Sequence, residues 1–211
     1  MNVYISSEFV SLYKFAAKLL KKLHICKFFH NFAQSIRNTM TNEHYVYRQT
    51  TLDFVTAAAQ TCLLLEHASE IEKDELIEQL LQLLPILYVR TRALEPTVPE
   101  LDGEPQQFVQ EEDYNFVLLG IQNLLGSDDT YLTVLTENQR YTDEPCMATI
   151  SEDLADIYQE LKDLAANFQT GQEAVMNDAV YLCRQQFTNH WGQKLLNALA
   201  ALHALHISKE D

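Results

Sequence analysis

The sequence is poor in glycine and proline, with 5 of each among 211 residues. Because these two residues punctuate turns, their scarcity argues against a fold of many short strands and favours long continuous elements. The hydrophobic fraction of 47% is too high for a disordered chain. A chain of this length can also bury a full core without disulfides or metal. We therefore expect one globular domain, with or without an appendage.

Cysteine is scarce as well, and the cysteines form no close pair. The sequence has four of them, Cys26, Cys62, Cys146 and Cys183. A structural zinc site needs ligands two to four residues apart, which these do not provide. Neither a disulfide framework nor a secretory signal is recognisable. These absences predict a cytoplasmic location, with the cysteines as small packing residues.

Positive charge is scarce relative to negative charge outside the N-terminal segment. The formal net charge is −15, whereas residues 1–39 carry six basic side chains against Glu8 alone, a net charge of +5. The remaining residues therefore carry a net charge of −20. A body this acidic repels phosphate backbones, so we expect no nucleic-acid binding by the main domain.

The N-terminal leader, residues 1–39, has the pattern of a basic amphipathic helix. Its apolar positions at helical spacing include Leu12, Phe15, Leu19 and Leu23. Three interpretations stay open. The leader binds an anionic membrane surface, or it docks on the acidic body, or the natural product starts at Met40 and lacks the leader. In each case residues 40–211 are expected to form a single helical domain.

Apolar residues recur at steps of three and four through most of the body, which predicts helices. We expect them over residues 45–68, 73–94, 110–125, 150–170 and 173–206. Pro85 lies inside the second helix and predicts a kink or a break. Residues 128–136 are ambiguous, with a short helix as one interpretation, residues 143–147 are expected to form a turn, and no strand is predicted. The expected fold is all-α, an antiparallel bundle of five to six helices with the leader helix as an appendage.

The clearest loop lies between the second and third of these helices. It contains Pro96, Pro99, Gly103 and Pro105 together with four acidic side chains. Loops of this length in compact domains are often functional, so we consider it as a mobile edge or a lid.

A first candidate site is a face of carboxylates on the predicted helix over residues 150–170. Glu152, Asp156 and Glu160 are spaced i, i+4, i+8 and so share one face. Two interpretations remain. The face is simply solvated, or a divalent metal or a basic side chain of the last helix such as Lys194 neutralises it. With a metal, the protein would be an enzyme that uses Asp156 and Glu160 with His190.

Recognisable catalytic and cofactor motifs are missing. None of the seven histidines lies three residues after a glutamate, which excludes the Glu-x-x-His pairs of di-iron and di-manganese bundles. His203 and His206 are explained by the favourable interaction of cations with a helix C-terminus. Phosphate-binding Gly-rich loops, Gly-x-Ser-x-Gly and His-Glu-x-x-His do not occur. We accordingly predict no cofactor, no metal ligand and no catalytic residue.

A second candidate site lies on the last helical segment. Asn189, Gln193 and Asn197 form a stripe of amides beside Trp191. Such amides bind a polar ligand or peptide, or they join neighbouring helices through a buried network. The candidate ligand- or partner-binding residues are Asp156, Glu160, Asn177, Asp178, Asn189, His190, Trp191, Gln193, Lys194 and Asn197.

Several stretches resemble an uncharacterised bacterial family of helical domains of unknown function. They are ISEDLADIYQELKDL (Ile150–Leu164), MNDAV (Met176–Val180), HWGQKLLNALAALH (His190–His203), LLPILYVR (Leu83–Arg90) and EEDYNFVLLGIQNLLG (Glu111–Gly126). The resemblance covers about residues 45–205 and leaves the leader outside. It implies a helical fold and a soluble bacterial setting, and it supplies no activity or catalytic residue.

These observations together favour a non-enzymatic helical module that binds another protein or itself. The helix-packing pattern, the acidic surface and the missing catalytic motifs all agree with this hypothesis. The alternative is the metal-dependent enzyme described above.

Overall fold

The computed structural model describes residues 44–134 and 145–208. These residues belong to one compact unit, His44–Asp211. The predictions for the leader, including the domain boundary after residue 39, lie outside the described residues.

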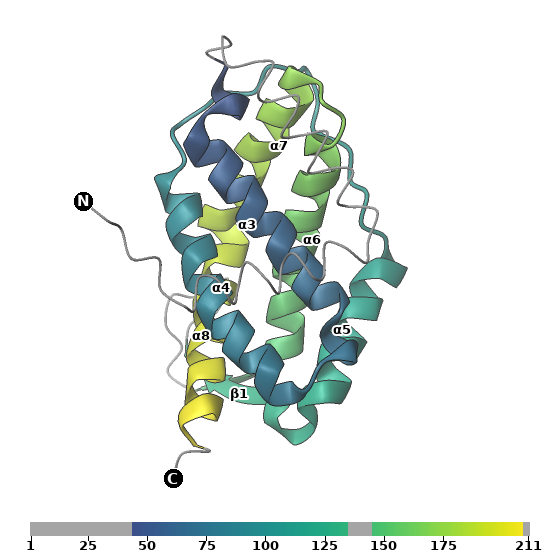
Figure 1. The fold of residues 1–211 in the computed structure, drawn as a ribbon, viewed down its shortest axis with the longest axis vertical. Coiled ribbons are helices and arrows are strands. Elements are labelled where there is room, and N and C mark those ends of the chain that lie inside the picture. The colour runs from purple at the N-terminus through teal and green to yellow at the C-terminus, as the bar shows by residue number, and fades with distance from the viewer. Residues whose placement is uncertain (1–43, 135–144, 209–211) are drawn as a thin grey trace, which may run out of the picture. The chain divides into compact units, whose positions relative to one another are not determined.

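The described residues form the helical bundle that the sequence predicts (Figure 1). The α-helices are α3 (Gln49–Glu66), α4 (Lys73–Ala93), α5 (Glu111–Leu125), α6 (Ile150–Phe168), α7 (Glu173–Gln186) and α8 (Gly192–Ile207). Short 3-10 turns are η1 (Tyr45–Tyr47), η2 (Ala68–Glu70) and η3 (Gly126–Asp129). A π-helical turn, η4 (Phe187–Trp191), joins α7 to α8. In Figure 1 the two helices therefore follow one another as one long helical segment.

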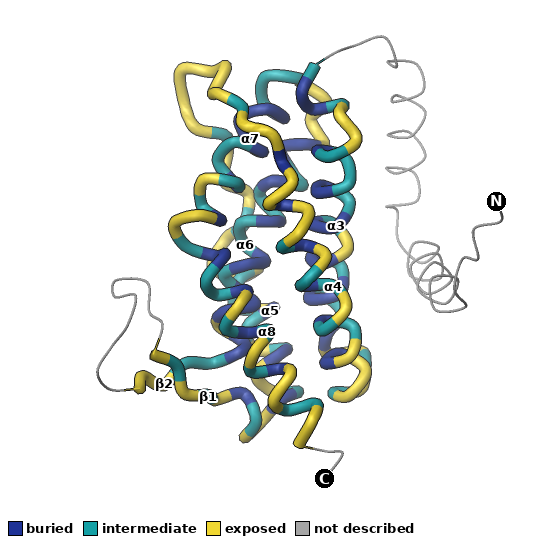
Figure 2. Tube along the Cα trace, turned by 90° about the vertical axis from the view of Figure 1, so that its left-hand side faces the viewer, coloured by how far each residue is buried: buried dark blue, intermediate teal, exposed yellow. Residues whose placement is uncertain are grey.

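Helix α6 is the centre of the bundle, because it packs against α3, α5, α7 and α8. Its apolar residues at steps of three and four are buried as predicted, namely Leu154, Ile157, Leu161, Leu164 and Phe168. Buried positions line the inner sides of the helices in Figure 2, and exposed positions lie outside. Within the described ranges, no helix combines the length and the apolar character needed to cross a bilayer.

The side chain of Thr149 caps the start of α6. Thr149 Oγ1 accepts the backbone N–H of Glu152 at 3.3 Å, and the same hydroxyl donates to the Glu152 carboxylate at 3.1 Å. The nearby Ser151 does not cap the helix and donates its hydroxyl to the buried Asp129 at 2.7 Å. The helix therefore begins at Ile150, as a Thr N-cap predicts.

Of the kink or break predicted at Pro85, the break is wrong, because α4 runs without interruption from Lys73 to Ala93. Proline removes one N–H from a helix and crowds the preceding turn. Here Leu84 and Leu87, next to it and half a turn beyond, are fully buried. Their packing stabilises the helical conformation on both sides of the proline.

Two short strands replace the short helix considered over residues 128–136 and the turn predicted over residues 143–147. Strand β1 (Thr130–Thr133) pairs antiparallel with β2 (Cys146–Thr149), with Leu132 opposite Met147. Four-residue strands are too short to show a convincing alternation of polar and apolar residues. Residues 135–144 lie outside the described residues.

Candidate functional site

The structure brings part of the first and second predicted sites into one polar cluster between α6 and α8. Lys194 Nζ lies 2.8 Å from Asp156 Oδ2 and 3.6 Å from Asp153 Oδ1. The Lys194 side chain is only 18% exposed and that of Asp153 only 7%. Lys194 of the last helix therefore neutralises Asp156, but it pairs with neither Glu152 nor Glu160 of the predicted carboxylate face.

Two tyrosines complete this cluster from other elements. The Tyr114 hydroxyl in α5 donates to Asp156 Oδ1 at 2.8 Å, and the Tyr131 hydroxyl in β1 donates to Asp153. Burial and the neighbouring carboxylates raise the pKa of both phenols well above the usual range. The phenols therefore stay protonated as hydrogen-bond donors. The cluster joins α5, α6, α8 and the hairpin in one network.

Asp153 is the carboxylate of this cluster whose pKa is raised. Burial raises its pKa to about 6, and this effect outweighs the hydrogen bond from Tyr131 and the charge of Lys194, which both lower it. Near neutral pH the side chain is mostly ionised and paired with Lys194. The geometry is that of a satisfied polar network that ties elements together.

Asn177 and Asp178 serve a different purpose from Asn189, Gln193 and Asn197. Both are buried in α7. Asp178 accepts the backbone N–H groups of Glu100 and Leu101 at 2.7 and 2.9 Å. Asn177 donates to the carbonyl of Val98 at 2.7 Å. The two side chains therefore fasten the first half of the loop between α4 and α5.

The second half of the same loop is fastened to α6. Asp163 Oδ1 accepts the backbone N–H groups of Phe108 and Val109 at 2.6 and 2.9 Å, and Asn167 donates to the carbonyl of Gln106 at 2.7 Å. The loop considered above as a mobile edge or a lid is thus held at both ends by buried or half-buried side chains. Its sequence did not reveal these partners, because they lie more than fifty residues away.

Glu160 does not join the Lys194 cluster, although it lies one turn beyond Asp156. It lines a small cavity of about 70 Å³ between the loop, α6 and α7. Burial, together with the negative charges of Asp163 and Asp156, raises its pKa to about 7. The carboxylates predicted to share one ligand therefore have separate surroundings.

The remaining predicted residues are divided between the core and the surface. Trp191 is fully buried, and its indole N–H donates to the Cys183 carbonyl at 3.0 Å. Gln193 donates to Asn197 at 2.9 Å. Asn189 is exposed and His190 is half-buried, both in the π-turn. Of the predicted stripe of amides, Gln193 and Asn197 are thus half-buried and bonded to each other, whereas Asn189 is exposed.

The π-turn explains why a glycine occurs at position 192, where its place inside a helical segment indicates close packing or a bend. A Cβ on Gly192 would lie 2.3 Å from the Phe187 carbonyl oxygen, closer than any real contact. The wider π-turn brings this backbone oxygen next to Gly192, and Phe187 and Trp191 pack edge to face with ring centroids 4.6 Å apart. Only glycine fits at this position.

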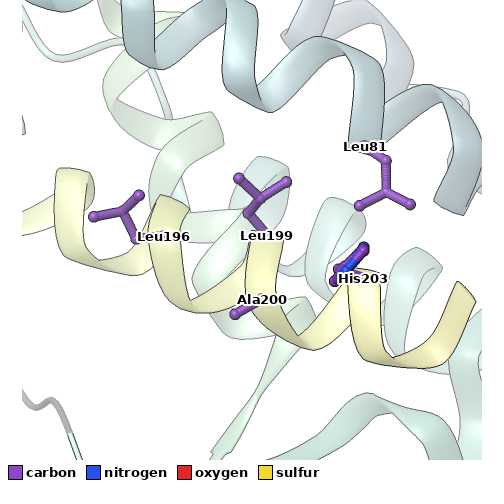
Figure 3. Close-up of a pocket in the computed structure, with 5 residues that line it drawn as sticks. All are labelled: Leu81, Leu196, Leu199, Ala200 and His203. Carbon is purple, nitrogen blue, oxygen red and sulfur yellow. The ribbon is translucent and has the colours of Figure 1, made fainter. Parts of the chain in front are cut away.

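An apolar groove runs along the outside of the bundle between α4 and α8. It has a volume of about 410 Å³ and is lined by Leu81, Leu196, Leu199, Ala200 and His203. Figure 3 shows Leu81 of α4 and His203 of α8 pointing toward each other across it, with Leu199 beside them. Leu196 is 41% exposed at one end of the groove. This surface is apolar, open and formed by two adjacent helices.

Sequence reasoning missed this groove and the two tyrosines. Leu199 was expected on the apolar face of the last helix, Leu81 had no predicted role, and His203 was interpreted only as a charge at the helix end. Leu196 carried a signal, because this apolar residue lies about 100° around α8 from the buried Leu195 and so falls beside the buried face. Tyr131 lies in the strand that was not predicted, and its contact with Asp153 could not be foreseen.

Among the described residues, the side chains proposed as metal ligands do not form a coordination site. Within residues 44–134 and 145–208, no three His, Cys, Asp or Glu side chains come together in a way that could hold a metal ion. Asp156 is paired with Lys194, and Glu160 lines a separate cavity.

Comparisons with known proteins give a family and a related structure. A family model described as a domain of unknown function, DUF5063, matches residues 45–208. The crystal structure of protein BF1032 from Bacteroides fragilis is 33% identical, with a TM-score of 0.69 over 77% of this chain and 95% of that chain. No curated protein matches the chain.

Proposed function

The chain belongs to the DUF5063 family, a domain of unknown function, and we propose that it is a non-enzymatic interaction module that binds an apolar helix of another protein. The observation that carries this proposal is the open groove between α4 and α8. An amphipathic helix that lays its apolar face in such a groove is a common mode of peptide recognition. Leu196 and Leu199 provide the apolar contact, and His203 provides a polar edge.

Charge favours another protein over a second copy as the partner. The formal net charge of −15 repels a second copy of the chain and attracts a partner with basic flanks. The partner that fits is therefore a helix with an apolar stripe and lysine or arginine beside it. We place this interaction in the cytoplasm, in agreement with the free thiols of Cys62 and Cys183 in the core.

The proposal is tested by comparing Leu196→Glu with Leu119→Glu. Both leucines are exposed on helices, at 41% and 50%, but only Leu196 lines the groove. Affinity capture with the full chain, quantified by mass spectrometry, should recover a partner that is lost with Leu196→Glu and kept with Leu119→Glu. Unfolding curves of both variants check that the fold is intact.

Two outcomes would contradict the proposal. Either no protein depends on Leu196 for its recovery, or the same proteins are lost with both variants. Analytical ultracentrifugation then measures the oligomeric state of the chain and of the Leu196→Glu variant. A dimer that Leu196→Glu dissociates would assign the groove to a second copy and would refute the charge argument.

A further inference from the structure

The loop between α4 and α5 covers a small polar cavity that the proposed interaction does not use. Loop residues from Glu104 to Gln107 form one wall, and α6 and α7 form the others. The volume is about 70 Å³, which holds a few water molecules or one small head group rather than a whole cofactor. The groove between α4 and α8 shares no residue with it.

The cavity is rich in hydrogen-bond acceptors. Amide side chains come from the loop, α6 and α7, including Gln107, Gln159 and Gln186. None of the described residues that line it is Lys, Arg or His. Its wall therefore offers oxygen atoms to a ligand and offers no cation of its own.

Glu160 is the carboxylate in this wall that has no partner. Asp163 is occupied by the backbone N–H groups of Phe108 and Val109. Glu104 is exposed at the rim. Within the described part of the chain, Glu160 has neither a hydrogen bond nor an ion pair, while Asp156 and Asp163 add negative charge nearby.

An unpaired carboxylate in such a place is costly when ionised. Removal from water disfavours the charge, and no donor compensates. The pKa of Glu160 is accordingly raised to about 7. A cation that enters the cavity would restore the missing partner and would favour the ionised form.

We propose that this cavity binds the head group of a small organic cation, an ammonium or a guanidinium, with Glu160 as its ion-pair partner. The N–H groups of the ligand then donate to the Glu160 carboxylate and to amide oxygens such as those of Gln159 and Gln186. A metal ion fits less well, because no three ligating side chains converge among the described residues. The loop over residues 104–107 forms the outer wall, and the rest of the ligand extends past it.

Direct binding by NMR tests this proposal on the full chain. The probes are n-propylguanidinium and n-propylammonium, with n-propanol as the neutral control. Glutamate is labelled at its carboxyl carbon, and the Glu160 signal is assigned with Glu160→Gln. With either cation present, the pKa of Glu160 should fall below its value in the free protein. The affinity should rise with pH as Glu160 ionises.

Two variants distinguish the effect of the Glu160 carboxylate from the effect of the net charge of the protein. Glu160→Gln should weaken binding of the cations by about tenfold or more, because it removes a charged hydrogen-bond partner, and should abolish the pH dependence. The control Glu78→Gln, at an exposed position on α4, should bind as the natural chain does.

Three results would overturn the proposal. They are an unchanged pKa of Glu160 with both cations, equal binding by Glu160→Gln and the natural chain, and binding of n-propanol as tight as that of the cations. None of these results bears on the α4–α8 groove, so the proposed interaction stands or falls separately.

Discussion

The carboxylate of Asp178 in α7 lies 2.9 Å from the backbone nitrogen of Leu101, a residue 77 positions earlier in the chain. The same carboxylate accepts the neighbouring N–H of Glu100 at 2.7 Å. One buried side chain thus satisfies two backbone donors of a loop that has no secondary structure of its own. This arrangement explains how the long connection between α4 and α5 stays attached to the bundle.

Asp178→Ala should therefore detach the first half of the loop. Two backbone donors lose the buried, charged acceptor that they share, and we expect a loss of about 1–3 kcal/mol in the free energy of unfolding. Urea unfolding measures this loss, and amide exchange should become faster at Glu100 and Leu101. Asp102→Ala, at an exposed position in the same loop, serves as the control. Equal stability of the two variants would refute the anchoring role.

Asp153 predicts a particular dependence of stability on pH. Its pKa is raised from 3.8 to about 6 by burial, so the folded chain holds a proton that the unfolded chain releases. The stability that this proton gives is fully present below pH 3.8 and is lost as the pH rises through about 6. Asp153→Asn removes the titratable carboxyl group. This variant should therefore not show the loss of stability with rising pH.

The measurement is the free energy of unfolding of both proteins across this range. Relative to Asp153→Asn, the natural chain should lose stability between pH 3.8 and about 6 and then change little. Asp102→Asn, at an exposed position, controls for the change in net charge. A difference between natural chain and Asp153→Asn that stays constant, or that shifts in the opposite direction, would contradict the raised pKa.

Two glycines in helical segments should respond in opposite ways to alanine. Gly192→Ala places a Cβ against the Phe187 carbonyl oxygen, which is backbone and cannot move aside, so we expect a loss of about 1–3 kcal/mol. Gly120 in α5 has no atom within 4 Å of the added Cβ. There alanine should stabilise by about 0.5–1 kcal/mol through its helix propensity. Urea unfolding of the pair tests both signs, and a stabilising Gly192→Ala would refute the close approach at the π-turn.

Most of the fold could be read from the sequence, because the helices bury residues at regular steps. Leu154, Ile157 and Leu161 lie in the core as their spacing predicts. Thr149 caps α6, and a threonine three residues before a glutamate is a typical sequence signal of such a cap. Periodicity did not reveal the hairpin, because Thr130–Thr133 is too short for a pattern and its partner strand was read as a turn. It also gave no weight to the packing that keeps α4 intact around Pro85.

The candidate sites were harder to predict, because they depend on contacts between distant segments. The sequence suggested that Lys194 forms ion pairs with carboxylates of α6. In the structure it pairs with Asp156 and Asp153. Spacing alone could not show that Glu160, on the same helix, faces a different cavity under the loop. Nor could it show that Asn177 and Asp178 hold that loop, since their partners lie about eighty residues away.

The groove between α4 and α8 is the central claim, and site-specific photo-cross-linking in living cells tests it most directly. A photoreactive amino acid placed at Leu196 should cross-link the full chain to a partner through the groove. The same amino acid at Leu119, an equally exposed position on α5, should not. Cross-links from Leu196 that disappear when Ala200→Glu fills the groove would support the interaction module. Cross-links that are absent from Leu196, or identical from Leu196 and Leu119, would contradict it.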